Sequence, residues 1–493
     1  MTTLPTLRPL ARGHLVAASA VLVAALAATN GRYDYHRDEL YFRMLEPAWG
    51  YVDQPPLTPL LAQGSIAVFG DSLWAVRVPA VLCMVAVLWL AALLAREFGG
   101  GEGAQALCAW GLCFAGVAAA FGHLMSTATV DLPIWLAVML FAVRALLRER
   151  PHWWLAAGAA AGIGLYNKHL VVLLVACLGV ALLAVGPRRA FARWQLWAGI
   201  GLMLLIGSPN LVYQVANDWP QLEMARAVAD DGGTEARILL LPFQLLLLGL
   251  FLVPIWVAGI AALLRRPEWR PVRALAVAYP VMLVVVLVTG GQMYYPLGLL
   301  IALYAAGCVP AAAWARTADR RRTLIVGVAA NSAVSAVIAL PLLPVGVVGH
   351  TPIPAMNSTI PDQVGWQTYV DQIEAVYASL PPEEQAAAII LTSNYGEAGA
   401  VDRYGENLPE VYSGHNELHD YGPPPHDATV VVGVQAPPLP TPLLHRYFGS
   451  CEAVAYMDNE VGVDNEEQDQ MIVVCRDPGR EWAQMWPDFR HYD

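Results

Sequence analysis

Two adjacent carboxylates, Asp38 and Glu39, stand in the first polar interruption of an apolar N-terminal half, in the stretch NGRYDYHRDELYFRMLEPAWGYVDQPPLTP. His36, Arg37 and Arg43 surround them, and the tyrosines and tryptophan of the stretch suit a lipid headgroup layer. Ionisable groups at a membrane edge are costly to place and are commonly functional. The pair is compatible with a gate, a helix cap or a catalyst, and it directs attention to chemistry at a bilayer surface.

Lys168 is the only lysine among the 29 Lys and Arg residues, and it interrupts the apolar stretch GIGLYNKHLVVLL beside His169. A cation buried at this place needs an anionic partner. Two interpretations stay open. Lys168 is either a snorkelling lysine at a helix end or a ligand for a phosphate group.

Asp131 is a further charge at a membrane edge, in the stretch HLMSTATVDLPIWLAVML. An aspartate at a helix start can cap the helix through its side chain and the helix dipole. The alternative is a second acidic group that faces the same outer cavity as Asp38 and Glu39.

The composition shows which elements must position these residues. The chain is 57% hydrophobic and 14% charged over 493 residues, and its mean hydropathy is +0.47. These values predict a polytopic α-helical membrane protein, because a span needs roughly 20 apolar residues. About eleven such runs occur: 13–29, 73–95, 103–122, 132–147, 153–167, 169–186, 195–216, 238–264, 273–290, 295–312 and 323–347.

The arginines fall in alternate loops, such as 144–150, 188–193 and 316–322. Because positively charged loops stay in the cytoplasm, this pattern predicts a cytoplasmic N-terminus and an outward-facing loop 30–72 with interfacial helices. The first apolar run is expected to remain as a span, because no small-residue cleavage site follows it. The predicted location is the plasma membrane, with several passes.

The chain changes character near Gly349, so we expect a membrane domain at 1–347 and an extracytoplasmic domain at 348–493. Helical and strand patterns alternate in the second domain, which predicts a soluble α/β domain with a largely parallel sheet. Much of the net charge of −11 lies there. A nucleic-acid partner is therefore not expected.

Cys451 and Cys475 are the only cysteines of the predicted outer domain, and each lies in an apparent strand. In an oxidising compartment the two could form a disulfide. No pair of cysteines has the spacing of a structural zinc site.

The motifs RDELYFRML, GYVDQPPL, VDLPIWLA, LYNKHL and QMYYPLGLLIALY occur in an order that resembles the GT-C glycosyltransferases of family 39. That family includes protein O-mannosyltransferases and bacterial aminoarabinose transferases. The resemblance covers about residues 10–345, and the acidic pair is its most specific element. The segments SNYGEAGAVDRYG and VYSGHN look like the tail of bacterial members.

The resemblance implies that the protein transfers a sugar from a polyprenyl-phosphate donor to an acceptor on the outer face, with inversion. It assigns the general base to Asp38. Glu39 would orient Asp38 or help to hold a metal, for which Asp131 is the other candidate. A divalent metal is thus compatible with the resemblance, but no cofactor is specified, because an acidic pair supplies too few ligands.

The departing lipid phosphate gains negative charge, which nearby cations would stabilise. Lys168 is the first candidate, followed by His169 and Arg37. Related transferases commonly have a lysine where this chain has Gln54, which puts more weight on Lys168. The expected substrate-binding residues are Asp131, Gln54, His36, Tyr294 and Tyr295. The two tyrosines are equally compatible with an interfacial aromatic belt.

A transporter or lipid-linked sugar flippase is the alternative, because it would also have many spans and buried charges. The absence of an obvious internal repeat and the concentration of charges at one membrane face argue against it. The identity of the sugar is left open, as is the acceptor, which could be a glycan, a lipid or a protein.

Overall fold

The computed structural model describes residues 5–231, 233–435 and 441–492. The chain divides into two compact units, and each is described by itself. We name them the helical unit (Met1–Thr29, Gln54–Thr58 and Arg77–Leu340) and the α/β unit (Asn30–Asp53, Pro59–Val76 and Pro341–Asp493).

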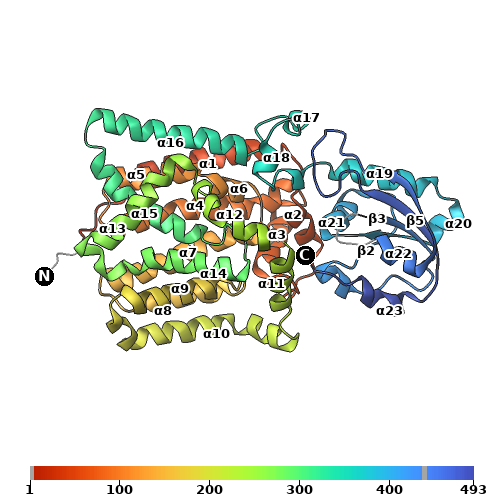
Figure 1. The fold of residues 1–493 in the computed structure, drawn as a ribbon, viewed down its shortest axis with the longest axis horizontal. Coiled ribbons are helices and arrows are strands. Elements are labelled where there is room, and N and C mark those ends of the chain that lie inside the picture. Colours follow the sequence, from red (N-terminus) through yellow and green to blue (C-terminus); the bar gives the residue numbers. More distant parts are fainter. Residues whose placement is uncertain (1–4, 232, 436–440, 493) are drawn as a thin grey trace. The chain divides into compact units, whose positions relative to one another are not determined.

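Long helices make up the helical unit (Figure 1). They are α1 (Arg12–Thr29), α4 (Leu73–Glu97), α5 (Glu102–Cys113), α6 (Gly116–His123), α7 (Thr127–Leu147), α8 (Trp153–Gly164), α9 (Leu170–Val185), α10 (Trp194–Ala216), α11 (Pro220–Asp231), α12 (Gly233–Leu246), α13 (Val253–Arg265), α14 (Ala274–Thr289), α15 (Leu297–Trp314) and α16 (Ala318–Ala339). Short 3₁₀ turns join some of them: η1 (Arg188–Ala192), η2 (Leu250–Leu252) and η3 (Pro267–Val272).

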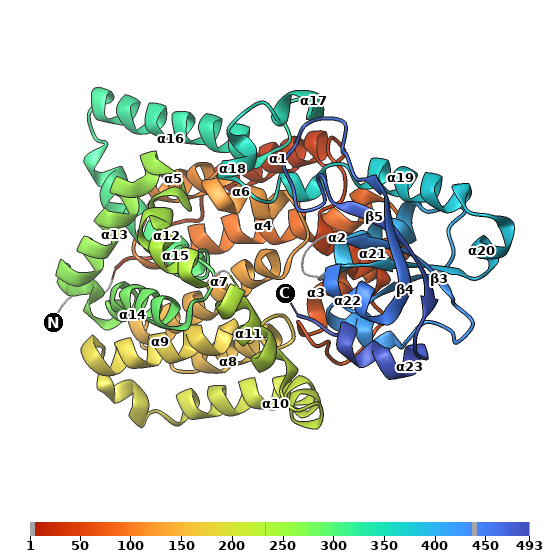
Figure 2. The same ribbon diagram turned by 45° about the vertical axis from the view of Figure 1, so that its right-hand side comes forward.

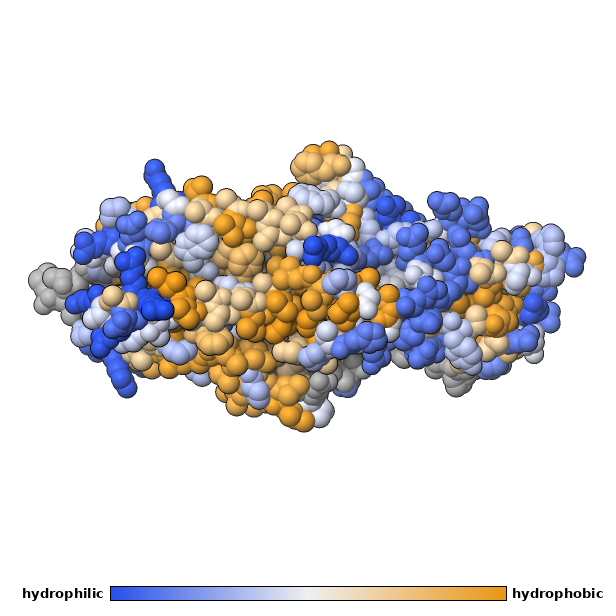
Figure 3. All heavy atoms as spheres, turned by 90° about the horizontal axis from the view of Figure 1, so that it is seen from above, coloured by the Kyte–Doolittle hydropathy of each residue, from blue (hydrophilic) through white to orange (hydrophobic). Residues whose placement is uncertain are grey.

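The lengths of these helices identify a multi-pass membrane protein, as the sequence predicted. Within the described residues, six helices are long and apolar enough to span a membrane, or eight when each of two bent pairs counts as one span. Every one of the eleven expected runs contains a helix. However, α8, α9 and α14 have only 12, 16 and 16 residues, fewer than a perpendicular crossing needs. On the face seen in Figure 3, apolar side chains form a broad band over this unit.

The two bent pairs are α5 with α6, at 62°, and α12 with α13, at 69°. Gly116 and Gly249 stand at the breaks with φ of 33° and 94°, values that glycine adopts most readily. The breaks also bond to each other, because the Val117 amide donates to the Leu247 carbonyl at 2.9 Å. Irregular backbone is tolerated inside a membrane protein when its polar groups are satisfied in this way.

The α/β unit contains a five-stranded sheet and the helices that cover it (Figure 2). Its strands are β1 (Ala388–Thr392), β2 (Val411–Ser413), β3 (Val430–Gln435), β4 (Phe448–Tyr456) and β5 (Met471–Pro478). Its helices are α2 (Arg37–Met44), α3 (Leu57–Phe69, which begins in the helical unit), α17 (Val345–Val348), α18 (Ile353–Met356), η4 (Pro361–Gln363), α19 (Trp366–Ser379), α20 (Pro382–Ala386), α21 (Tyr395–Tyr404), η5 (Asn416–Tyr421), α22 (Thr441–Tyr447), α23 (Trp482–Met485) and η6 (Trp486–Phe489).

The sheet is mixed, which corrects the expectation of a largely parallel sheet. In the order β2-β1-β3-β5-β4, β1 pairs in parallel with β2 and β3, whereas β5 runs antiparallel to both β3 and β4. The reason is the connection between β4 and β5. It is a loop without a crossover helix, and such a loop returns the chain antiparallel to the strand that it leaves.

Both faces of the sheet are covered. On one face α19 contacts β3 and β4, and α21 contacts β1 and β2. The other face packs on α22, α23 and η6 through a buried apolar cluster that includes Ile389, Leu391, Val431, Leu444, Val473, Trp482 and Phe489. Strands buried on both faces are continuous apolar runs, as AIILT and VVVGV are here.

The first polar loop of the chain belongs to the compact α/β unit. The expected division put residues 30–72 with the membrane domain, whereas Asn30–Asp53 and Pro59–Val76 group with Pro341–Asp493. The close fit of α2 to α21 explains this grouping (Figure 1). A Cβ atom on Gly399 of α21 would collide with the backbone of Leu40 in α2.

Cys451 of β4 and Cys475 of β5 face each other across the antiparallel ladder, and a disulfide joins them. We expect peptide mapping without reduction to recover the two cysteines as one linked pair. Cys451→Ser should lower the free energy of unfolding by about 2–4 kcal/mol, the usual effect of losing a disulfide. Thermal unfolding of the purified chain measures this. Cys177→Ser in α9 is the control, and finding both Cys451 and Cys475 as free thiols would contradict the expectation.

Candidate functional site

The N-terminus of α2 is closed by a capping box. The side chain of His36 accepts a hydrogen bond from the Asp38 amide at 3.2 Å, and Glu39 Oε2 accepts from the His36 amide at 2.9 Å. Glu39 has no exposed surface. Its carboxylate therefore satisfies a backbone group that the helix start leaves unpaired, and the structure gives Glu39 a structural task beside the role expected for it.

Arg37 and His36 are tied to acidic side chains of the same unit. Arg37 Nη2 lies 2.6 Å from Glu466 and 2.9 Å from Glu467, and His36 Nε2 lies 3.4 Å from Asp362. Burial disfavours the imidazolium, but the bond to Asp362 and the charge of Asp38 outweigh it and raise the pKa of His36. The Nη2 atom of Arg37 is thus occupied by two glutamates and is not free for a lipid phosphate.

Asp38 differs from its neighbours because its side chain is 30% exposed. Its Oδ1 atom accepts a hydrogen bond from the Tyr395 hydroxyl at 3.2 Å and lies 4.0 Å from His36 Nδ1. Asp38 is thus a carboxylate that is held by protein groups yet open to a substrate. A general base needs both properties.

A second carboxyl pair lies beside Asp38, and the sequence analysis missed it. Asp53 Oδ1 accepts from the Tyr41 hydroxyl at 3.3 Å, and that hydroxyl accepts from the Glu417 amide at 3.2 Å. Burial, with added repulsion from Glu417 and Asp38, raises the pKa of Asp53 to about 7. Burial also raises the pKa of Glu417 to about 7. The only sequence signal was the position of Asp53 directly before Gln54 in GYVDQPPL.

A second cluster is centred on Asn167 in the helical unit. The side-chain amide nitrogen of Asn167, Nδ2, donates to Asp131 Oδ1 at 2.7 Å and to the Thr127 carbonyl at 2.8 Å. Thr58 Oγ1 bonds to Asn167 Oδ1 at 2.5 Å. Asp131 is the fifth residue of α7, and its side chain is buried. The residue that caps this helix is Ser126. The helix-cap interpretation of Asp131 therefore does not describe its contacts.

Lys168 joins this cluster through its charge. Its ammonium lies 5.0 Å from the ring centre of Tyr295 and 5.8 Å from that of Tyr294, within the range of cation–π attraction. The charge of Asp131 stabilises the same ammonium. The helical unit thus brings together Lys168, Asp131 and both tyrosines.

His169 and Gln54 occupy neighbouring places in the helical unit. His169 Nε2 lies 2.9 Å from Asn210 Oδ1 in α10. Gln54 is buried, and the segment that it begins is fixed by a 2.7 Å bond from the Leu57 amide to the Tyr166 carbonyl. The segments QPPLT and LYNKHL are therefore in direct contact.

Arg77 of α4 is a further cation that the sequence analysis did not select. It is fully buried, and its Nη1 lies 3.4 Å from Nε2 of the buried His123. No group of three His, Cys, Asp or Glu residues in the described ranges could hold a metal ion.

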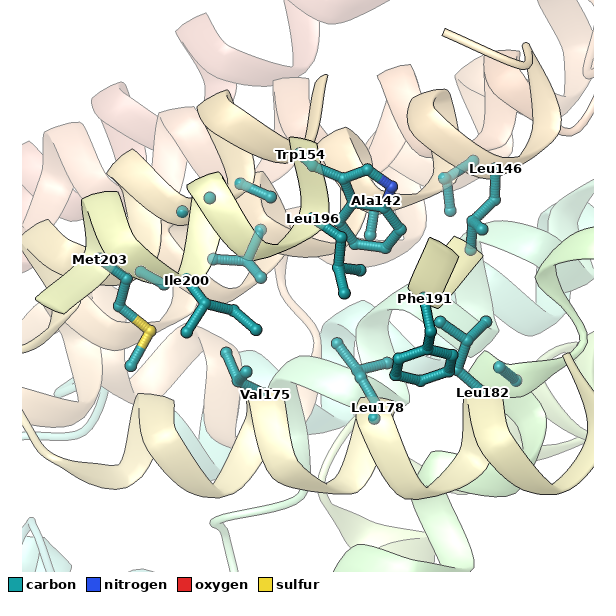
Figure 4. A pocket seen from close by; sticks show the side chains of 18 of the residues that line it. Ala142, Leu146, Trp154, Val175, Leu178, Leu182, Phe191, Leu196, Ile200 and Met203 are labelled. Carbon is teal, nitrogen blue, oxygen red and sulfur yellow. The ribbon is translucent and has the colours of Figure 1, made fainter. Parts of the chain in front are cut away.

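An apolar pocket lies among α7, α8, α9 and α10 (Figure 4). Trp154, Phe191, Leu196 and Met203 are among its lining residues, and its volume is about 140 Å³. None of the described residues that line it is charged. The pocket suits a hydrocarbon chain, and it offers no group for acid–base chemistry.

The raised pKa of Asp53 predicts a pH dependence of stability. Between about pH 4 and 7 the unfolded chain has lost the Asp53 proton whereas the folded chain keeps it, so the free energy of unfolding falls as pH rises. In the Asp53→Asn variant the free energy of unfolding should fall less over this pH range. Urea unfolding of the purified chain at several pH values measures it. Glu46→Gln, an exposed carboxyl of the same loop, is the control, and equal slopes in wild type and Asp53→Asn would contradict the prediction.

Comparisons with known proteins bear on this arrangement. Residues 53–213 match the sequence model of the family described as dolichyl-phosphate-mannose-protein mannosyltransferase. No curated protein matches the sequence.

Solved structures resemble the chain over most of its length. ArnT from Cupriavidus metallidurans bound to undecaprenyl phosphate is 16% identical, with a TM-score of 0.59 over 94% of this chain and 98% of ArnT. The apo state of ArnT gives 0.61 over the same shares at the same identity. The oligosaccharyltransferase AglB from Archaeoglobus fulgidus, in complex with an inhibitory peptide and a dolichol-phosphate, is 12% identical, with a TM-score of 0.50 over 86% of this chain and 69% of AglB.

The resemblance indicated by the sequence motifs is therefore confirmed: the chain has the fold of the GT-C glycosyltransferases, and its residues 53–213 match the family of dolichyl-phosphate-mannose-protein mannosyltransferases.

Proposed function

We propose that this multi-pass membrane protein is an inverting glycosyltransferase that uses a polyprenyl-phosphate sugar as donor. The observation that carries the proposal is the environment of Asp38. Its carboxylate lies in the first turn of α2, is partly exposed, and accepts a hydrogen bond from the Tyr395 hydroxyl. Support comes from the matched family, whose description contains a lipid-phosphate sugar, and from the ArnT fold, which was solved with undecaprenyl phosphate.

In the proposed reaction Asp38 accepts the proton of an acceptor hydroxyl group. The hydroxyl oxygen forms a bond to the anomeric carbon of the donor sugar, and the bond between that carbon and the phosphate oxygen breaks. Its electron pair leaves with the polyprenyl phosphate. A single displacement of this kind inverts the anomeric configuration, and a base placed at the nucleophile lowers its barrier.

We assign the leaving phosphate to Lys168. An ammonium that lies against two aromatic rings is already positioned, so it loses little freedom when an anion binds. Positioned cations stabilise the charge that develops on a leaving group. Tyr294 and Tyr295 would then border the headgroup of the donor.

The distribution of arginines supports a cytoplasmic N-terminus and an α/β unit outside the membrane. On this orientation the acceptor is a glycan, lipid or protein of the outer face. The bilayer supplies the donor.

Asp38→Asn is expected to abolish sugar transfer, because the amide cannot take a proton, while the chain still folds. The assay uses membranes that contain the full-length chain and labelled polyprenyl-phosphate sugars, one sugar at a time, and it measures label transfer and polyprenyl-phosphate release. Near-normal turnover by Asp38→Asn would remove the proposed base. Glu46→Gln, which changes an exposed carboxylate of the same loop, is the matched control.

Lys168→Ala is expected to slow transfer by about 100-fold, the scale of losing one positioned charge at a transition state. Lys168→Arg should retain part of the activity, because it keeps a cation between the two rings. Arg189→Ala, an exposed arginine that pairs with Glu149, is the control for lost positive charge. Kinetics of Lys168→Ala equal to wild type would return Lys168 to the snorkelling interpretation.

A further inference from the structure

Tyr395 stands at a rigid point of the α/β unit, at the first residue of α21. Asn394 caps the helix, and its side chain accepts from the Glu397 amide at 2.9 Å. Glu397 Oε2 returns bonds to the Ser393 amide and hydroxyl, both at 2.8 Å. A capping box with these extra bonds fixes the backbone that carries Tyr395.

The ring of Tyr395 is clamped on both faces. It stacks on Tyr41 of α2 with ring centres 4.6 Å apart and on His415 with centres 4.8 Å apart. The Tyr395 amide also donates to His415 Nδ1 at 3.2 Å. His415 in turn stacks on His491, whose Nε2 atom lies 2.7 Å from the Ser393 carbonyl oxygen. Stacked rings of this kind leave the phenol little rotational freedom.

The phenol reaches one substrate-accessible group, the carboxylate of Asp38. Burial, followed by the charge of Asp38, raises the pKa of Tyr395 well above its usual value. The hydroxyl therefore keeps its proton and donates it in a hydrogen bond to Asp38 Oδ1 at 3.2 Å. In the described part of the chain, the side-chain contacts of Asp38 fall on its Oδ1 atom. The Oδ2 atom of Asp38 is therefore left to meet a substrate hydroxyl group.

We propose that Tyr395 is the positioning residue of the reaction, fixing the Asp38 carboxylate through the bond to Oδ1 so that Oδ2 is presented to the acceptor. This inference rests on the proposed role of Asp38 as base. Its basis is the juxtaposition of a clamped phenol with a partly exposed carboxylate that lies 357 residues away in the sequence.

The inference gives the C-terminal region a part in the chemistry. The catalytic and substrate-binding residues expected from the sequence all precede that region, which was expected to be a separate outer domain. If Tyr395 positions Asp38, the α/β fold exists partly to hold one hydroxyl group against the base. Correct placement of a reacting group increases the rate of the chemical step by a large factor.

The test is Tyr395→Phe, which keeps the ring and its two stacking partners and removes only the hydroxyl. We expect kcat for sugar transfer to fall by about 10- to 100-fold, the scale of one hydrogen bond to a charged group. KM for the donor should stay unchanged. A variant that merely folded less well would lower the amount of active protein without changing how the rate depends on pH.

The pH profile supplies that second readout. Without the phenol, ionised Asp38 loses a donor that favours its charged form, so the acid limb of kcat against pH should move to higher pH. The titratable groups that face Asp38 are His36 at 4.0 Å, Asp53, and Tyr395 itself. Because Tyr395→Phe keeps His36 and Asp53, a shifted limb in this variant reports the lost bond.

Tyr404→Phe is the matched control. Tyr404 is the last residue of the same helix, and its hydroxyl also donates to an aspartate of the first loop, Asp34. Removing that phenol costs a comparable bond but leaves Asp38 untouched. We expect wild-type kcat and an unshifted pH profile.

The outcomes separate the two proposals. If Asp38→Asn abolishes transfer while Tyr395→Phe keeps wild-type kcat and pH profile, the positioning role of Tyr395 is wrong and the base remains. If Tyr404→Phe shows the same loss as Tyr395→Phe, the effect is structural and the inference also fails. If Asp38→Asn turns over normally, or if no labelled donor is consumed by the wild type, the proposed function itself fails.

Discussion

The buried ion pair between Arg37 and Glu467 is the constraint on which the arrangement of the α/β unit depends. The side chain of Glu467 is 1% exposed and that of Arg37 is 12% exposed. Removing either partner would leave a charge without compensation in a medium where that is expensive. The pair therefore fixes the first turn of α2 against the loop between β4 and β5. The capping box, Asp38 and the Tyr41 phenol all follow from the position of that turn.

The same constraint explains the contrast between Asp38 and the acids around it. Glu39 and Glu467 are buried and Asp53 is half-buried, and each of the three is occupied with a backbone group, a phenol or an arginine. Asp38, in contrast to the buried Glu39 and Glu467, keeps 30% of its side chain exposed. A site that must bind a hydroxyl substrate needs one acid that water can reach, in surroundings that hold its geometry. Burial of the neighbours supplies the rigidity.

Much of this could be predicted from the sequence, and the rest could not for identifiable reasons. Asp38, Lys168 and Asp131 stood out because charge in an apolar chain is expensive. The cap by Glu39 was hidden because histidine is not a usual N-cap residue. Tyr395 was missed because nothing in its local sequence shows that it meets a carboxylate 357 residues away. Asp53 was missed because its environment also depends on a distant residue, Glu417. The mixed sheet was missed because apolar runs reveal burial and not strand direction.

The contact between Arg37 and Glu467 spans 430 residues of sequence, which has a consequence for biosynthesis. A ribosome adds about 5–20 residues each second, so the glutamates that neutralise Arg37 are synthesised roughly 20 to 90 seconds after α2. Throughout that interval the Arg37 guanidinium lacks the two carboxylates, Glu466 and Glu467, that pair with it in the folded unit.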